Sequence, residues 1–384
     1  MFMIHELISI DYVQLSIPIF LLLIVAEVFY SRRKRKFEYR LSDSITNIAT
    51  GALQNMTALV FGALTIAAYV YIHKNYALFD FRNLSNAQTW VMAISLIILC
   101  DFLYYWFHRM SHEVKIMWAG HVVHHQSEEY NLSVALRQGT FQQFFSWPFY
   151  LPLAFIGFEP LWYASMISLV TAYQFWIHTE HIGKLGPFEW IFNTPSHHRV
   201  HHGVDPEYLD KNHAGLLIIW DRIFGTFQEE KQRPQYGTVV PLKSWNPVWA
   251  NLDYFKEVYL LSKKCRSWDK LLVWFRNPAW VPEGKCAIAD RNREKFDIPL
   301  SPKRAQYALT NFTIVVAVAF MFLTFFPKLK ETQALIIYSF LIISFALIGG
   351  LLENKKWIKI TEPIRITTTL VGFFGIVSYY LAIL

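Results

Sequence analysis

The chain alternates between long apolar runs and polar stretches that are rich in histidine or in basic residues. A membrane-spanning helix needs about 20 apolar residues to cross a hydrocarbon core about 30 Å thick. The pattern therefore predicts an all-α, multi-pass transmembrane helical bundle. The apolar runs lie at Tyr12–Tyr30, Ile48–Ile72, Thr89–Phe107, Phe141–Phe158, Leu161–Ile177, Tyr307–Phe326, Thr332–Leu352 and Ile364–Leu384.

Basic residues beside these runs predict how the chain crosses the membrane. The first run ends in the basic block Arg32–Lys36, whereas a cleavable signal peptide carries its charge before the apolar region. We therefore expect a retained first span with its N-terminus outside and the basic block in the cytoplasm. Three crossings return the chain to the cytoplasm at His108. The fourth and fifth runs, divided at Glu159-Pro160, are expected to form a deep hairpin that brings His178 back to the same face.

Composition agrees with a membrane protein and argues against several other classes. Hydrophobic residues make up 54% of the chain and charged residues 17%, whereas soluble domains are typically about 25% charged. The net charge of +7 gathers beside apolar runs, which indicates membrane orientation and not nucleic-acid binding. Cys100, Cys265 and Cys286 lie far apart, so neither a disulfide framework nor a zinc ribbon is predicted.

The distribution of polar residues predicts four parts. Residues 1–88 hold N-terminal spans, and residues 89–235 hold the histidine-rich part. Residues 236–305 are expected to form a polar cytoplasmic segment, and residues 306–384 a last group of spans without histidine.

Histidine is the most ordered feature of the sequence, because eleven of the fourteen histidines lie between His108 and His202. Spacings of three or four residues place side chains on one face of a helix. The boxes are His108-x3-His112, His121-x2-His124-His125, His178-x2-His181 and His198-x2-His201-His202. We therefore predict a cytoplasmic cluster of imidazole ligands at the membrane face.

Ligand number and type narrow the chemistry of this cluster. All-nitrogen sites suit zinc, copper, iron or nickel, and a single zinc with about four ligands would leave half of the histidines idle. Nine or more histidines fit two metal ions. The sequence has no HExxH motif, no deaminase signature and no nucleotide-binding glycine loop. Electrons for a redox reaction would therefore come from another molecule.

The segments 101–112 (DFLYYWFHRMSH), 121–125 (HVVHH) and 194–202 (TPSHHRVHH) resemble the fatty acid hydroxylase/sterol desaturase superfamily. Within this superfamily, the sequence around the boxes is similar to that of the alkylglycerol monooxygenase branch, which cleaves glyceryl ethers. That similarity includes 117–121 (MWAGH), 129–133 (EYNLS), 175–180 (FWIHTE) and 219–227 (IWDRIFGTF).

The resemblance implies a non-haem di-iron centre that uses O2 to oxidise a lipid C–H bond. In the glyceryl-ether branch the electron donor is tetrahydrobiopterin, and the products are a fatty aldehyde and glycerol. His181 is either a tenth ligand or a residue that supports the ligands, and His197 is expected to be a bystander. The other ligands implied by the resemblance are His108, His112, His121, His124, His125, His178, His198, His201 and His202.

Several polar residues near the boxes are candidates for supporting roles. Glu128 and Asn131 are expected to hydrogen-bond ligand imidazoles. Glu180 is expected to orient a histidine or to bind a cationic cofactor. Asp101 lies in a span, where a carboxylate is costly, so it should face the metal site or a partner. His213 stands where the family leads us to expect a tyrosine, and it is expected to line a pocket or to support the ligands.

Two other functions stay open on sequence grounds. One is hydroxylation or desaturation of a different lipid, such as a sterol, fatty acid or carotenoid. The electron donor is expected to be a reduced pterin or a redox protein. The other is metal transport, which would need ligands near mid-bilayer, whereas these lie at span ends and in loops. The host membrane would be the endoplasmic reticulum or a bacterial inner membrane. The lipid substrate and the oligomeric state do not follow from the sequence.

Overall fold

The computed structural model describes residues 7–35, 38–282, 287–290 and 293–383, with side chains described up to residue 370. Within these ranges the regular structure is helical, apart from two isolated β-bridges, which confirms the all-α prediction. His5, Lys36 and Cys286 fall outside the described residues. The α-helices are α2 (Tyr12–Arg33), α3 (Leu41–Tyr76), α4 (Asn86–Glu113), α5 (Lys115–His125), α6 (Gln142–Ser146), α7 (Leu151–Ile156), α8 (Pro160–Tyr173), α9 (Pro195–His201), α10 (Ile219–Ile223), α11 (Pro247–Lys264), α12 (Asp269–Leu272), α13 (Pro302–Phe325), α14 (Glu331–Leu352) and α15 (Ile358–Ile383). Short 3-10 turns cover Val134–Leu136, Trp147–Tyr150, Gly186–Trp190, Val273–Phe275 and Phe326–Lys328.

Five helices are long and apolar enough to cross a membrane, among the residues that the structure describes. They are α2, α3, α4, α13 continued through its last 3-10 turn, and α14. Their exposed faces carry large apolar side chains, for example Leu22, Leu64 and Val91, as expected where lipid replaces water. The chain is therefore an integral membrane protein.

The predicted hairpin exists, but its arms are shorter than the apolar runs. Pro148 and Pro152 divide the first arm into α6, a 3-10 turn and α7, because proline fits only the first turn of a helix. Gly157 then reverses the chain with a φ of 114°, a conformation that favours glycine. The second arm, α8, has 14 residues. Neither arm is among the candidate spans.

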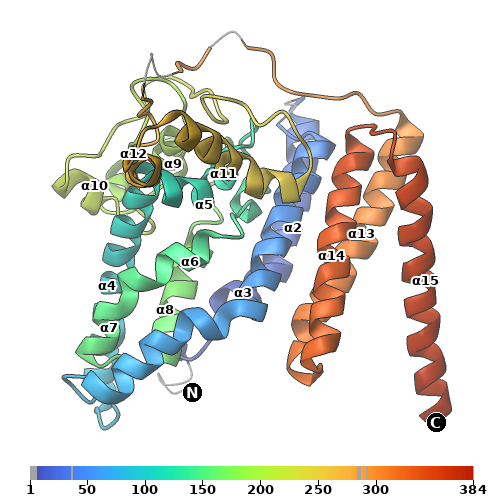
Figure 1. Ribbon diagram of the computed structural model, residues 1–384. Helices are drawn as coiled ribbons and strands as arrows, with labels where there is room; N and C mark the ends of the chain where they lie inside the picture. The colour runs from blue at the N-terminus through green and yellow to red at the C-terminus, as the bar shows by residue number, and fades with distance from the viewer. Residues whose placement is uncertain (1–6, 36–37, 283–286, 291–292, 384) are drawn as a thin grey trace.

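The short helices α5, α9, α10, α11 and α12 gather at one end of the bundle, at the level where α13 begins and α14 ends (Figure 1). This end carries all four histidine boxes. Two cores support it. One joins α3 to α13 and α14 and includes Trp245 from the polar segment. The other joins α4 to α7 and α8, so the helix that carries His108 is packed against the hairpin.

Candidate metal centre

Nine of the predicted ligands meet in two adjacent groups of buried imidazoles. In each group, one nitrogen of every residue lies within 4.8 Å of the others. Among the described residues, neither group includes a carboxylate or a thiolate. The five-histidine group is His108, His112, His121, His125 and His201, and the four-histidine group is His124, His178, His198 and His202.

The two HxxHH boxes hold the groups side by side. On α5, His121 and His125 stand one turn apart in the five-histidine group, while His124 turns to the other group. The box at α9 divides in the opposite sense, since His201 joins the five-histidine group. The rings of His125 and His202 stack with centroids 4.5 Å apart across the boundary. Each box therefore contributes to both groups.

Hydrogen bonds at the outer nitrogens fix which nitrogen faces inward. A carbonyl oxygen only accepts, so each Nδ1 that contacts one must carry the proton. Nδ1 of His124 donates to the Arg137 carbonyl at 2.7 Å, and Nδ1 of His178 to the Gln174 carbonyl at 2.7 Å. Nδ1 of His108 donates to the His213 carbonyl at 2.8 Å. These imidazoles therefore present unprotonated Nε2 atoms to the centre, as metal-ligating histidines do.

The spacing of these inner nitrogens fits a metal ion. Nε2 of His124 and Nε2 of His178 are 3.3 Å apart, yet two unprotonated nitrogens cannot hydrogen-bond to each other. Nε2 of His198 lies 3.0 Å from that of His178. Metal–nitrogen bonds of about 2.1 Å that meet at right angles place two nitrogens about 3.0 Å apart. A cation between the lone pairs would therefore account for the arrangement.

Burial keeps these histidines in the neutral form that binds metal. It lowers the pKa of His121 to about 4, although a hydrogen bond from Nδ1 to Gln142 opposes the shift. It also lowers the pKa of His178 to about 4. The pKa of His125 and His202 is lowered further, because burial adds to repulsion between neighbouring imidazoles. At neutral pH the groups therefore offer lone pairs and not positive charge.

The histidines predicted as a possible ligand, a bystander and a supporting residue, namely His181, His197 and His213, lie outside both groups. Nε2 of His181 is 2.9 Å from Oε2 of Glu38 and 2.8 Å from the Ser31 hydroxyl. His197 points toward Glu189, at 4.0 Å. His213 is fully buried, with its ring centroid 5.0 Å from that of His112.

Among the candidate supporting residues, the backbone carbonyl of His213 binds a ligand imidazole, that of His108, whereas the side chains of Asp101, Glu128 and Asn131 bind elements around the centre. Asp101 accepts the backbone N–H groups of Leu216 and Leu217 and the Trp220 indole N–H, so the carboxylate in the span does have partners. Asp101 thereby fixes the loop that contains His213, and the backbone carbonyl of His213 accepts the hydrogen bond from Nδ1 of His108.

Glu128 and Asn131 were expected at the imidazoles, but they hold other backbone segments. Glu128 accepts the Phe296 N–H at 2.7 Å, and Asn131 donates to the Glu38 carbonyl at 2.6 Å. Both residues come after the end of α5, so their side chains turn toward the neighbouring segments.

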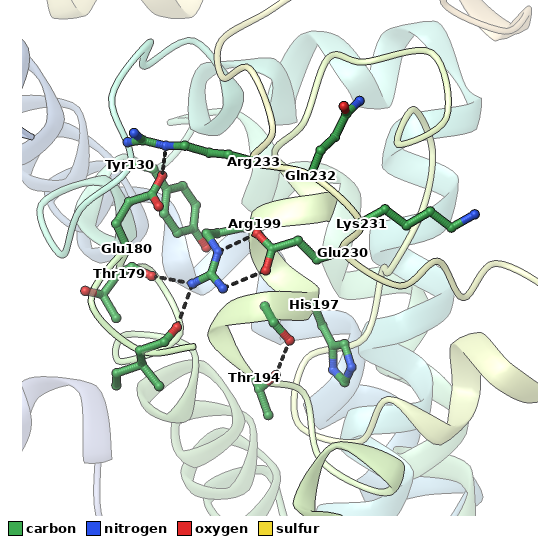
Figure 2. Close-up of polar contacts among 12 residues, drawn as sticks. Tyr130, Thr179, Glu180, Thr194, His197, Arg199, Glu230, Lys231, Gln232 and Arg233 are labelled. Carbon is green, nitrogen blue, oxygen red and sulfur yellow. Dashed lines mark hydrogen bonds and ion pairs between the residues drawn. The ribbon is translucent and has the colours of Figure 1, made fainter. Parts of the chain in front are cut away.

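An arginine that the sequence pattern does not single out as a site residue lies between two ligand-bearing segments. Arg199, on α9 between His198 and His201, is 5% exposed. Figure 2 shows its guanidinium enclosed by Glu230 and by the backbone of residues 179–182. Both of its bonds to the Glu230 carboxylate are 2.7 Å long, and it also donates to the carbonyls of Thr179 and Ile182. It thus ties α9 to the loop that follows His178.

Glu180 accepts Nε–H of Arg233 at 3.2 Å (Figure 2). It also accepts the Tyr236 hydroxyl at 2.5 Å. The Tyr236 ring stacks on Tyr130, which in turn stacks on His178. Glu180 therefore supports the aromatic wall behind the four-histidine group. A single sequence does not reveal such pairings, because the partners are far apart along the chain.

A cavity of about 400 Å³ opens directly onto the centre. Four of the nine histidines line it, namely His112, His125, His201 and His202. Its other walls include aliphatic side chains such as Val122, Val204 and Leu261. A mostly apolar cavity with a few polar groups is typical of a small-molecule site.

Comparison with known proteins places this arrangement. The family model described as fatty acid hydroxylase matches residues 93–226, which contain all nine histidines. Alkylglycerol monooxygenase of Homo sapiens is 38% identical over 92% of this chain and 81% of its own length. That of Danio rerio is 38% identical over 92% of this chain and 80% of its own.

A more distant relative is an ornithine lipid hydroxylase of Rhizobium tropici, which is 30% identical over 36% of this chain and 43% of its own length. No solved structure matches the chain. The long alignments and the match of the family model to the histidine-bearing region together assign the chain to a family. The chain belongs to the fatty acid hydroxylase family and is an integral membrane enzyme.

Proposed function

We propose that this chain is a di-iron lipid monooxygenase that cleaves the ether bond of alkylglycerols. The observation that carries the proposal is the pair of all-histidine groups next to an apolar cavity. Alkylglycerol monooxygenases that align along 92% of the chain support the choice of substrate. Nine nitrogens in two groups suit two ions that accept five or six ligands, and iron is such an ion.

In the proposed reaction the protein holds the metal ions, positions the substrate and excludes bulk water. The nine histidines would bind the two irons, which supply activation of O2 for insertion of one oxygen atom into a C–H bond. Carbonyls of Arg137, Gln174 and His213 keep the ligand nitrogens aimed inward. The cavity places an apolar substrate against His112 and His201 and keeps bulk water away from the reacting carbon.

The overall chemistry balances with a two-electron donor. Oxidation at the carbon next to the ether oxygen consumes O2, two electrons and two protons, and it yields a hemiacetal and water. The hemiacetal separates into a fatty aldehyde and glycerol without further catalysis. We propose tetrahydrobiopterin as the donor, on the basis of the alkylglycerol monooxygenase resemblance. We further propose that the histidine end of the bundle faces the cytoplasm, in the endoplasmic reticulum or a bacterial inner membrane.

Iron analysis of the purified protein, together with an ether-lipid assay with and without reduced pterin, tests the proposal. Two irons per chain and pterin-dependent release of aldehyde are expected. A single zinc or no bound metal would contradict the di-iron centre. An intact iron centre without ether cleavage would instead favour hydroxylation of another lipid, for which the similarity to an ornithine lipid hydroxylase is the supporting observation. The variants His201→Ala and His124→Ala should each lose activity while the helical content is retained.

A further inference from the structure

The cavity beside the histidines is roofed by a part of the chain that the family model does not match. The matched residues end at 226, whereas the roof comes from the strap 237–242, from α11, and from Asn277, Pro278, Ala279, Val281 and Ala287. On α11 the lining residues are Asp253, Tyr254, Glu257, Val258 and Leu261. Spacings of four residues place Asp253, Glu257 and Leu261 on one helical face. The floor, by contrast, comes from the region that the family model matches and includes residues of α5 and α9.

Aliphatic side chains are the largest group in this wall, which indicates what it binds. Val122 and Val204 of the floor and Val258 and Leu261 of the roof all line the cavity. Val258 is only 2% exposed, although it borders the cavity. The charged groups on the roof, Asp253 and Glu257, have their pKa raised because burial disfavours the charged form. Such a wall favours a methylene chain over a polar group, since each buried CH2 contributes about 0.8 kcal/mol.

The strap is fixed in place and does not hang freely over the cavity. Arg293 donates to the carbonyls of Tyr236, Thr238 and Val239. Nε of Arg293 lies 3.6 Å from Oε1 of Glu128, which follows the box on α5. Glu128 therefore connects the roof to the helix that carries His121, His124 and His125. Because Arg293 fixes the strap and also lies beside Glu128, the strap keeps one position over the cavity. A cavity with a fixed wall can discriminate among alkyl chains by their length and bulk.

We propose that this cavity holds the aliphatic chain of the substrate and that α11 and the strap decide which chains fit. The proposal rests on the proposed function only in taking a lipid as the substrate. Specificity would then reside in the roof, beyond the histidine-bearing region that defines the family. The two neighbours Leu261 and Leu260 separate this role from general effects on α11, because Leu261 lines the cavity and Leu260 is 47% exposed outside it.

The test uses the full chain in nanodiscs with a long-chain alkyl lipid that carries a diazirine at the end of its chain. After photolysis, peptide mapping should find the label on α11 or the strap. Leu261→Trp should lower this labelling by about tenfold or more, as overpacking of a filled site predicts, and Leu260→Trp should leave it unchanged. Val239→Phe, on the strap, offers a second way to fill the cavity. Iron content, measured alongside, should be the same in all variants.

Equal labelling in the Leu261 and Leu260 variants, or labelling confined to the spans, would overturn the proposal. If ether cleavage fails but the label still maps to α11, the proposed substrate is wrong and the chain site stands. If ether cleavage succeeds, product analysis with alkylglycerols of graded length should show that Leu261→Trp shifts the preference to shorter chains. An unchanged length profile in that variant would also overturn the proposal.

Discussion

The ion pair between Arg199 and Glu230 offers a sharp test of how the centre is held together. We expect Glu230→Ala to destabilise the protein and to reduce the metal content of the four-histidine group. Burial opposes the charge on Arg199, but the hydrogen bonds and the charge of Glu230 outweigh it, so the pKa of the guanidinium is raised. An arginine side chain stays protonated in proteins even without a partner, so removal of Glu230 leaves the charge of Arg199 buried without that counterion.

The magnitude follows from the contacts. The side chain of Arg199 is 6% exposed and that of Glu230 14%, and two hydrogen bonds of 2.7 Å join them. Removing one partner of a buried pair costs about 3–5 kcal/mol. The carbonyls of Thr179 and Ile182 remain as acceptors, so we expect the lower end, about 3 kcal/mol. The loss would destabilise α9 and the loop after His178, and three of the four ligands of that group, His178, His198 and His202, lie on or next to these two segments.

The assay combines thermal unfolding in detergent with iron counted per chain. Glu229→Ala is the matched control, because Glu229 is the adjacent residue and pairs with Lys184 in solvent. The control should unfold like the parent protein and keep its iron. The double variant Arg199→Met, Glu230→Leu should regain part of the lost stability, since an apolar pair can replace a buried ion pair. Equal stability and iron content in the Glu229 and Glu230 variants would refute the reasoning.

Three further predictions concern the centre itself. His201→Ala should lower activity by more than the roughly 10–100-fold that is typical when a residue hydrogen-bonded to a metal ligand is lost. His197→Ala, outside both groups, should keep its iron. Loss of iron in both variants would argue against the assignment of ligands to the two groups. The folded pKa of His178, about 4, lies below its unfolded value of about 6.5. As the pH falls, the unfolded chain therefore takes up protons before the folded chain does, so chelator-treated protein should be fully stable above pH 6.5 and lose stability as the pH falls toward 4. Chemical unfolding at several pH values measures this stability. A free energy of unfolding that does not change with pH would count against the prediction. At Gly139 an added Cβ would lie 1.8 Å from the carbonyl oxygen of the residue before the second histidine box, whereas Gly62 faces open space; Gly139→Ala should thus reduce iron content and Gly62→Ala should not, as measured by metal analysis of both variants.

The spacing of the histidine boxes carries much of the information about the centre. Spacing alone singles out His108 and His112 on α4 and the set on α5, and all of these residues belong to the two groups. What spacing does not provide is the division between the groups. His124 lies one residue from His125 in sequence but faces the other group, because successive residues on a helix point about 100° apart. Only the packing of α5 against α9 decides which neighbour turns which way.

Apolar runs are a good guide to the long spans and a poorer one to the hairpin. The runs near α2, α3 and α4 are single helices. The run from Phe141 to Phe158 is broken by Pro148 and Pro152, which mean hydropathy does not register. The segment 236–305 has the composition of a polar cytoplasmic part, yet it contributes the roof of the cavity. The lining positions of α11 include Asp253 and Glu257 as well as Val258 and Leu261, so no apolar pattern along this helix marks the face that borders the cavity.

The acidic residues near the centre share one role, which the sequence alone does not show: they fix the segments that carry the histidines. Asp101, Asp221, Glu128 and Glu230 all lie close in space to ligand-bearing segments, yet none belongs to either histidine group. Each binds backbone N–H groups or an arginine that fixes a loop. Because the candidate ligands are neutral imidazoles, two bound dications would keep their positive charge uncompensated in a buried site. Such a centre favours electron-rich ligands, and the carboxylates stabilise its frame from outside without competing for the metal.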